Sequence, residues 1–152
     1  MAYIDKNTFL ATIAYVIGTT AWASQWALNT QYYTNSIDMG VTANRKIVNG
    51  GCVVFRVGTV PVQAGNSTRL ELLCSASATG GTDTILWSTG ELANTVVNAW
   101  TVNSIVFVVK IPAVIPLQYF MAGYYLTTTA WTAGTMDIFC VPQWPVPYSG
   151  GM

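Results

Sequence analysis

Residues 69–74 have the sequence Arg-Leu-Glu-Leu-Leu-Cys, in which Leu70, Leu72 and Cys74 alternate with Arg69 and Glu71. Successive side chains of a β-strand point to opposite faces, so this alternation predicts a strand with one buried and one solvated face. Glycine-containing turns flank the segment on both sides, which limits it to the length of one strand.

Other runs of β-branched and aromatic residues follow the same plan and are separated by Gly, Asn or Pro. The run 105–109 is apolar on both faces, which predicts a strand that is covered on both sides. We expect the run 52–57 to end at Gly58 and Pro61, and a turn at Ala133-Gly134. Further strands are predicted at 84–87, 118–122, 124–127 and 136–141.

Many short strands at this spacing favour an all-β fold, an antiparallel jelly-roll-like β-sandwich. A short helix around Val96 to Trp100 stays open as an alternative for that segment. The chain of 152 residues has the size of one domain.

The composition indicates that much of the surface is covered by something other than water. Charged residues make up 8% of the chain and hydrophobic residues 52%, whereas an ordinary soluble domain has about a quarter of its residues charged. The formal net charge is zero and there is no run of basic residues, so binding to nucleic acid is disfavoured. Lipid, a secretory environment and other protein subunits are the remaining coverings.

The N-terminal segment 8–28 is uncharged over about the length that spans a bilayer. Several Thr, Ser and Gln residues interrupt it and no basic block flanks it, which argues against a membrane partner. A signal peptide stays open, because the apolar run 9–17 is followed by Ala21-Trp22-Ala23. We favour an extended arm that lies against another protein surface.

The chain offers little for catalysis. It has no histidine, its six carboxylates are scattered, and it has no phosphate-binding or calcium-binding motif. Cys52, Cys74 and Cys140 are far apart in the sequence and lie in apolar runs, so they are predicted to be buried free thiols. We therefore expect no enzyme, with no catalytic residue, no cofactor and no metal site.

The six tryptophans allow two interpretations. They would form a sugar-stacking platform in a secreted or surface carbohydrate-binding β-sandwich module, or they are core and interface anchors. We favour the second interpretation. The tryptophans are Trp22, Trp26, Trp87, Trp100, Trp131 and Trp144.

The order of several short motifs resembles the small capsid cement (decoration) proteins of tailed bacteriophages, of the type first described in a Bordetella phage. The resemblance covers roughly residues 34–143, and the opening residues 3–6 also look like the first residues of that family. The motifs are Thr-Asn-Ser-Ile-Asp-Met-Gly at 34–40, Arg-Lys-Ile-Val-Asn-Gly-Gly at 45–51, Leu-Trp-Ser at 86–88, Val-Lys-Ile-Pro at 109–112, Gln-Tyr-Phe at 118–120 and Trp-Thr-Ala-Gly-Thr-Met at 131–136. A longer apolar segment before Thr34 and a Pro-rich tail depart from the pattern.

The resemblance implies a structural virion protein that binds the outside of an assembled head as a homotrimer and stabilises it. The implied partners are further copies of the chain and the major capsid protein of the phage head, with assembly in the host cytoplasm. The expected division is an N-terminal arm at 1–33, a jelly-roll cement domain at 34–143 and a C-terminal tail at 144–152. A head fibre or tail protein is the alternative within phage structural proteins.

Two groups of residues are candidates for the contacts of such a protein. Phe139 and Val141 lie on the face of their predicted strand opposite Met136 and Ile138, so they are candidates for the trimer contact. The candidates for contact with the shell lie near the chain ends, which have low charge and many aromatic residues. They are Tyr3, Phe9, Trp22, Trp26, Trp144 and Tyr148.

Overall fold

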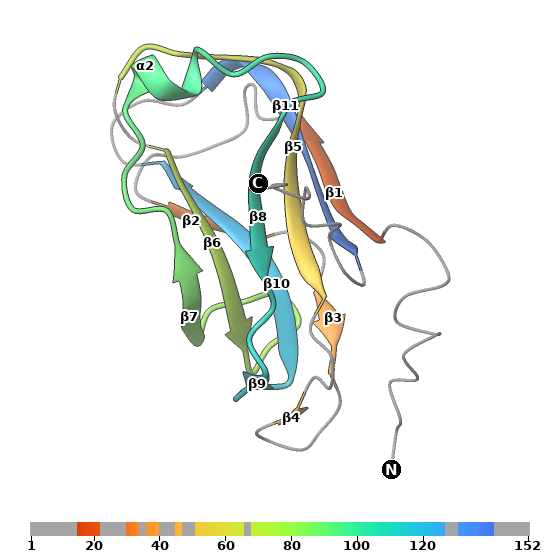
Figure 1. Cartoon of the computed structure of the whole chain (residues 1–152). Helices are drawn as coiled ribbons and strands as arrows, with labels where there is room; N and C mark the ends of the chain where they lie inside the picture. Colours follow the sequence, from red (N-terminus) through yellow and green to blue (C-terminus); the bar gives the residue numbers. More distant parts are fainter. Residues whose placement is uncertain are drawn as a thin grey trace, which may run out of the picture.

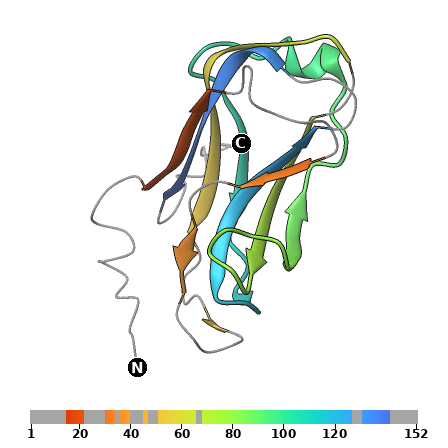
Figure 2. The ribbon, with the colours of Figure 1, turned by 180° about the vertical axis from the view of Figure 1, so that it is seen from behind.

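Two antiparallel β-sheets lie face to face in the computed structural model of this chain (Figures 1 and 2). The structure describes residues 15–21, 30–33, 36–39, 45–46, 51–65, 68–126 and 131–141. In spatial order, sheet A contains β1 (Tyr15–Ala21), β11 (Trp131–Val141), β5 (Cys52–Gln63) and β8 (Ile105–Lys110). Sheet B contains β2 (Thr30–Tyr33), β10 (Tyr119–Leu126), β6 (Thr68–Ser75) and β7 (Asp83–Ser88), with β3 (Ile37–Asp38) also beside β10.

Three smaller elements complete the described part of the chain. The strands β4 (Arg45–Lys46) and β9 (Val114–Ile115) pair with each other at one end of the sandwich. The helix α2 (Asn94–Val97) lies at the opposite end (Figure 1). The short helix that stayed open as an alternative around Val96 to Trp100 is therefore present, but it begins two residues earlier, at Asn94.

The eight longer strands of the described part pair in a nested order. The first pairs with the last, β1 with β11, and the second with the second to last, β2 with β10. Further inward, β5 pairs with β8 and β6 with β7. This order results when one long antiparallel hairpin folds over, so that its successive strand pairs are divided between the two sheets.

The core fills the space between the sheets. From sheet A, Phe55 and Met136 are fully buried, and from sheet B, Leu72 and Phe120 are fully buried. Near the β7 and β8 edges the core is aromatic, because four rings lie 5.7–6.4 Å apart between centroids. These rings belong to Phe55, Trp87, Trp100 and Phe107. The all-β antiparallel sandwich that the strand pattern predicted is thus confirmed.

Several predicted strand limits were wrong. The segments 118–122 and 124–127, predicted as separate strands, form the single strand β10. Strand β5 continues through Gly58 and Pro61 to Gln63, and β11 begins at Trp131, so it includes the predicted turn at Ala133-Gly134. The pairing of β5 with β11 shifts register three times between Trp131 and Met136. Irregular pairing of this kind accommodates glycine and proline without ending a strand. Strand β8 no longer pairs with β5 beyond Arg56. The missing N–H of Pro61 therefore costs no hydrogen bond between these two strands.

The predicted burial of two strands was also wrong. In β6, Glu71 on the face that we expected to be solvated is only 1% exposed, and Leu73 on the same face is equally buried. In β8, by contrast, Ile105 and Val108 are 42% and 38% exposed, because β8 is the outermost strand of sheet A. The strand covered on both faces is therefore β6, and the apolar run 105–109 is covered on one face only.

Part of the expected N-terminal arm belongs to the sandwich. Residues Tyr15–Ala21 form β1 at one edge of sheet A, and Thr30–Tyr33 form β2 beside β10 in sheet B. The expectation of an arm over residues 1–33 is therefore wrong for these two segments. The C-terminal tail at 144–152 lies outside the described residues.

Candidate interaction surfaces

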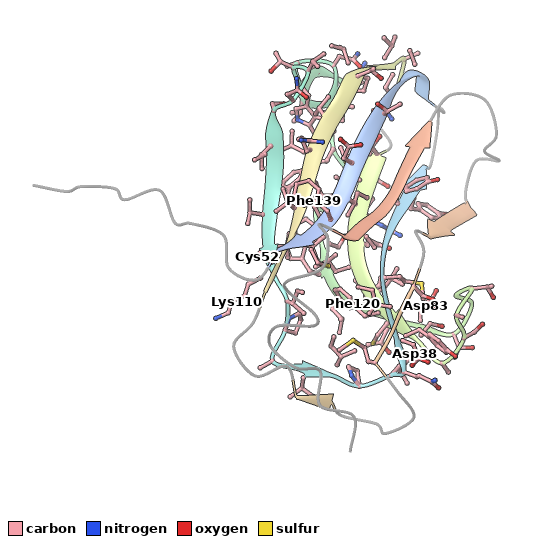
Figure 3. The ribbon with its side chains drawn as sticks, turned by 90° about the vertical axis from the view of Figure 1, so that its right-hand side faces the viewer. Asp38, Cys52, Asp83, Lys110, Phe120 and Phe139 are labelled. Carbon is pink, nitrogen blue, oxygen red and sulfur yellow. The ribbon has the colours of Figure 1, made fainter. Side chains whose placement is uncertain are left out.

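The outer face of sheet A carries one of the two predicted trimer-contact residues. Phe139 pairs with Val54 of β5, and Val54 pairs in turn with Val108 of β8, so the three side chains form an apolar row across the sheet. Figure 3 shows Phe139 over the middle of this sheet. Phe139 is half-buried and Val108 is exposed, whereas Val54 between them is fully buried. The backbone of Val141 pairs with Cys52 at the end of β11, but its side chain lies outside what the structure describes.

An ion pair adjoins this apolar row. Arg56 Nη2 and Nε donate hydrogen bonds to the same oxygen of Asp137, Oδ2, at 2.6 and 3.1 Å. The Arg56 guanidinium carbon also lies 5.6 Å from the centroid of the Phe139 ring. The two charges that flank the row therefore neutralise each other, which leaves an electrically neutral surface around Phe139.

The outer face of sheet B contains an ion pair that the sequence did not predict, between the half-buried Arg69 and the buried Glu71. Arg69 Nε lies 2.6 Å from Glu71 Oε1 without the alignment of a hydrogen bond, and Glu71 Oε2 has no hydrogen-bond partner among the described residues. The Arg69 guanidinium carbon lies 4.6 Å from the centroid of the Tyr125 ring. The alternation of Arg69 and Glu71 with leucines had indicated solvated side chains, and only the burial of this face shows otherwise.

Exposed aliphatic side chains are a second feature that the strand pattern missed. Eight large apolar residues of the described part are 38–54% exposed. Their positions are Val60, Val62, Ile85, Val96, Val102, Ile105, Val108 and Val114. Several lie in turns or at strand ends, where periodicity gives no information about burial.

All six predicted shell-contact residues lie outside the described residues. They are Tyr3, Phe9, Trp22, Trp26, Trp144 and Tyr148. Their contact with a shell therefore stays a prediction. Of the six tryptophans, Trp87 and Trp100 pack among the core aromatics, so these two do not form a sugar-stacking platform.

The described titratable and nucleophilic side chains are dispersed. Within the described ranges no three His, Cys, Asp or Glu residues come together in a way that would hold a metal ion. Cys74 and Cys140 are buried free thiols, as predicted, whereas Cys52 is only half-buried. Burial raises the pKa of the Cys140 thiol to about 12 and also raises the pKa of the Cys74 thiol.

No helix in the described ranges is both long and apolar enough to cross a membrane. A scan against protein-family models and a search of curated proteins found no match to this chain. The surfaces described above are therefore the basis for the functional proposal.

Proposed function

We propose that this chain is a structural virion protein that decorates and stabilises the head of a tailed bacteriophage, and that it binds the outside of the capsid shell as a homotrimer. The order of the sequence motifs and the sandwich fold suggest this function, and the exposed apolar surface supports it. The same proposal places the protein on the capsid exterior after assembly in the host cytoplasm.

The nested pairing supports a jelly-roll assignment for the sandwich. Jelly rolls contain eight strands in two sheets and occur in viral capsid proteins. Here the eight longer strands of the described part pair first with last and inward from there. A fold of this class hosts many functions, so it is the surface that has to carry the functional argument.

The observation that carries the proposal is the exposure of branched aliphatic side chains on a surface with few charges. Val62, Val102 and Ile85 are each about half exposed, although burying a side chain of this kind gains about 1.5–3 kcal/mol. Where such side chains form a contiguous patch on a soluble protein, the patch marks an interaction site. A decoration protein needs such area and complementarity rather than a reactive group.

The apolar row on sheet A is the proposed contact between copies. Phe139 and Val108 lie across the sheet in line with Val54, and the neighbouring Arg56 and Asp137 neutralise each other. Aromatic residues with a neutral apolar surround are typical of interface centres. Val141 stays a candidate beside this row.

Multivalency would strengthen the proposed contact with the shell, because the capsid lattice repeats the same binding site many times. Three linked copies bind several capsid subunits at once, so the affinity of each single contact can be modest. The proposal is tested by mixing the purified chain with undecorated heads and pelleting them. Binding at a fixed ratio supports it, and a chain that stays in the supernatant contradicts it.

A further inference from the structure

The ion pair on the outer face of sheet A leaves one hydrogen-bond donor and one acceptor unused. Arg56 Nη2 and Nε both donate to the same oxygen, Asp137 Oδ2, at 2.6 and 3.1 Å. Within the described part of the chain, Arg56 Nη1 and Asp137 Oδ1 take part in no hydrogen bond. The enclosed side-chain atoms without a hydrogen bond all belong, among the described residues, to Arg69 and Glu71. The two unused groups of the sheet A pair are therefore open to solvent.

The structure holds both side chains in a fixed orientation. Arg56 and Asp137 are directly opposite each other in the pairing of β5 with β11. The Arg56 guanidinium carbon also lies 5.6 Å from the centroid of the Phe139 ring. The side chain of Arg56 is 42% exposed and that of Asp137 is 17% exposed. Because the planar guanidinium is already oriented, a partner that binds it loses little conformational entropy in ordering it.

Any protein that covers this face has to satisfy both open groups. The contact removes them from water, and a desolvated polar group without a hydrogen-bond partner costs more free energy than the bond itself contributes. The covering surface must therefore offer an acceptor to Arg56 Nη1 and a donor to Asp137 Oδ1. A purely apolar surface offers neither. A surface that carries only carboxylates or only cations offers one of the two.

We infer that a second copy of this chain supplies both groups, so that Arg56 of one copy donates to Asp137 of the next. The same two side chains provide the donor and the acceptor, and the face is therefore complementary to itself. A cyclic assembly repeats one contact around its axis, and three copies form three equivalent bonds beside their Phe139 rings. The inference rests on the proposed homotrimer and names the residues that determine how its copies meet.

Charge reversal in the full chain distinguishes a bond between copies from the bond within one copy. Arg56→Glu leaves two carboxylates at this position, and Asp137→Lys leaves two cations. Each variant alone should form trimers at least tenfold more weakly by light scattering, because like charges meet across the contact. An equimolar mixture should recover trimers, since most contacts in a mixed trimer join opposite charges. Native mass spectrometry identifies the mixed trimers by their mass.

The matched control is Glu91→Lys. It reverses an exposed charge between β7 and α2, outside sheet A, so it should form trimers like the wild type and should not assemble preferentially with either variant. Circular dichroism checks that all three variants are folded.

Two outcomes overturn the inference while the wild type still forms trimers that pellet with phage heads. One is a mixture of folded variants that recovers no trimer, which would confine the Arg56–Asp137 bond to a single copy. The other is a pair of variants that each form trimers as the wild type does. A wild-type chain that stays monomeric and does not pellet with heads would overturn the proposed function itself. If the reversed variants do not fold, Arg56→Gln and Asp137→Asn decide, with trimers at least threefold weaker expected and unchanged trimers contradicting the inference.

Discussion

At the residue scale, Gly134 shows how a local conformation decides a strand. Its φ of 118° is one that residues with a side chain rarely adopt, and a Cβ there would lie 2.6 Å from Pro61 Cα. This close approach allows β11 to continue beside β5 where the register shifts. The sequence Ala133-Gly134 indicated a turn, because a glycine with positive φ serves equally in a turn and in a bulge.

Replacing Gly134 with Ala should destabilise the fold by about 2–6 kcal/mol, from backbone strain and overpacking together. Gly81→Ala is the matched control, since Gly81 has a φ of 115° but nothing within 4 Å of its Cβ position. The control should cost only the strain, about 1–3 kcal/mol. Urea unfolding measures both, and equal losses would contradict the close contact with Pro61.

The buried thiol of Cys140 predicts a pH dependence of stability. Its pKa is raised by burial from 9.0 to about 12, so between these values the unfolded thiol ionises while the folded one stays neutral. The stabilisation is complete below pH 9 and is lost as the pH rises toward 12. Urea unfolding at pH 8 and pH 10.5 should show a smaller pH-dependent loss in Cys140→Ala than in the wild type. Equal losses would contradict the prediction.

At the element scale, strand positions follow from the sequence but strand environments do not. Local alternation in Leu70, Leu72 and Cys74 predicted β6 correctly, since side-chain direction depends only on neighbours along the chain. Burial of Glu71 on the other face depends on what packs over sheet B, and no local pattern contains that. For the same reason the run at 105–109 predicted a covered strand, whereas its place at the edge of sheet A leaves Val108 exposed.

The order of the strands within the two sheets could not be predicted from the sequence either. Partners such as Tyr15 and Cys140 are distant along the chain, and pairing between them is set by packing of the whole sandwich. The candidate sites also divide into residues that local alternation predicts and residues that only the fold brings together. Alternation predicted that Phe139 lies opposite Met136 and Ile138. The exposed Val62, Val96 and Val102 lie in β5, α2 and a loop, and only the fold brings these elements together.

The joint between α2 and β5 gives a prediction at this scale. Asn98→Ala removes both hydrogen bonds to the Gln63 backbone, so we expect a loss of about 1–3 kcal/mol in the free energy of unfolding. Thr95→Ala, an exposed change in the same helix, should stay within about 0.5 kcal/mol. Thermal unfolding compares the two, and an unaffected Asn98 variant would show that the joint does not stabilise this end.

At the scale of the whole molecule, an apolar row crosses sheet A from Phe139 to Val108. The row suits the proposed assembly, in which copies meet side by side. The neutral Arg56–Asp137 pair beside Phe139 would let two such faces approach without net repulsion. The low content of charged residues predicted that part of the surface is covered by other protein. The exposed apolar side chains are the candidate places for that contact.

Phe139→Asp should convert the proposed trimer to monomers or aggregates, because it places a carboxylate at the centre of the proposed contact between copies. The new carboxylate would lie beside Arg56, which permits the subunit itself to fold. Val114→Asp, an exposed position on β9 outside sheet A, should leave the proposed trimer intact. Light scattering distinguishes these species, and an unchanged trimer in the Phe139 variant would remove this residue from the contact.

The most direct test of the central claim is light scattering of the purified full chain, repeated after mixing with undecorated phage heads and pelleting. The proposed function predicts a particle of three times the chain mass that pellets with the heads at a fixed ratio. A monomer that stays in the supernatant after the heads have been pelleted would contradict it.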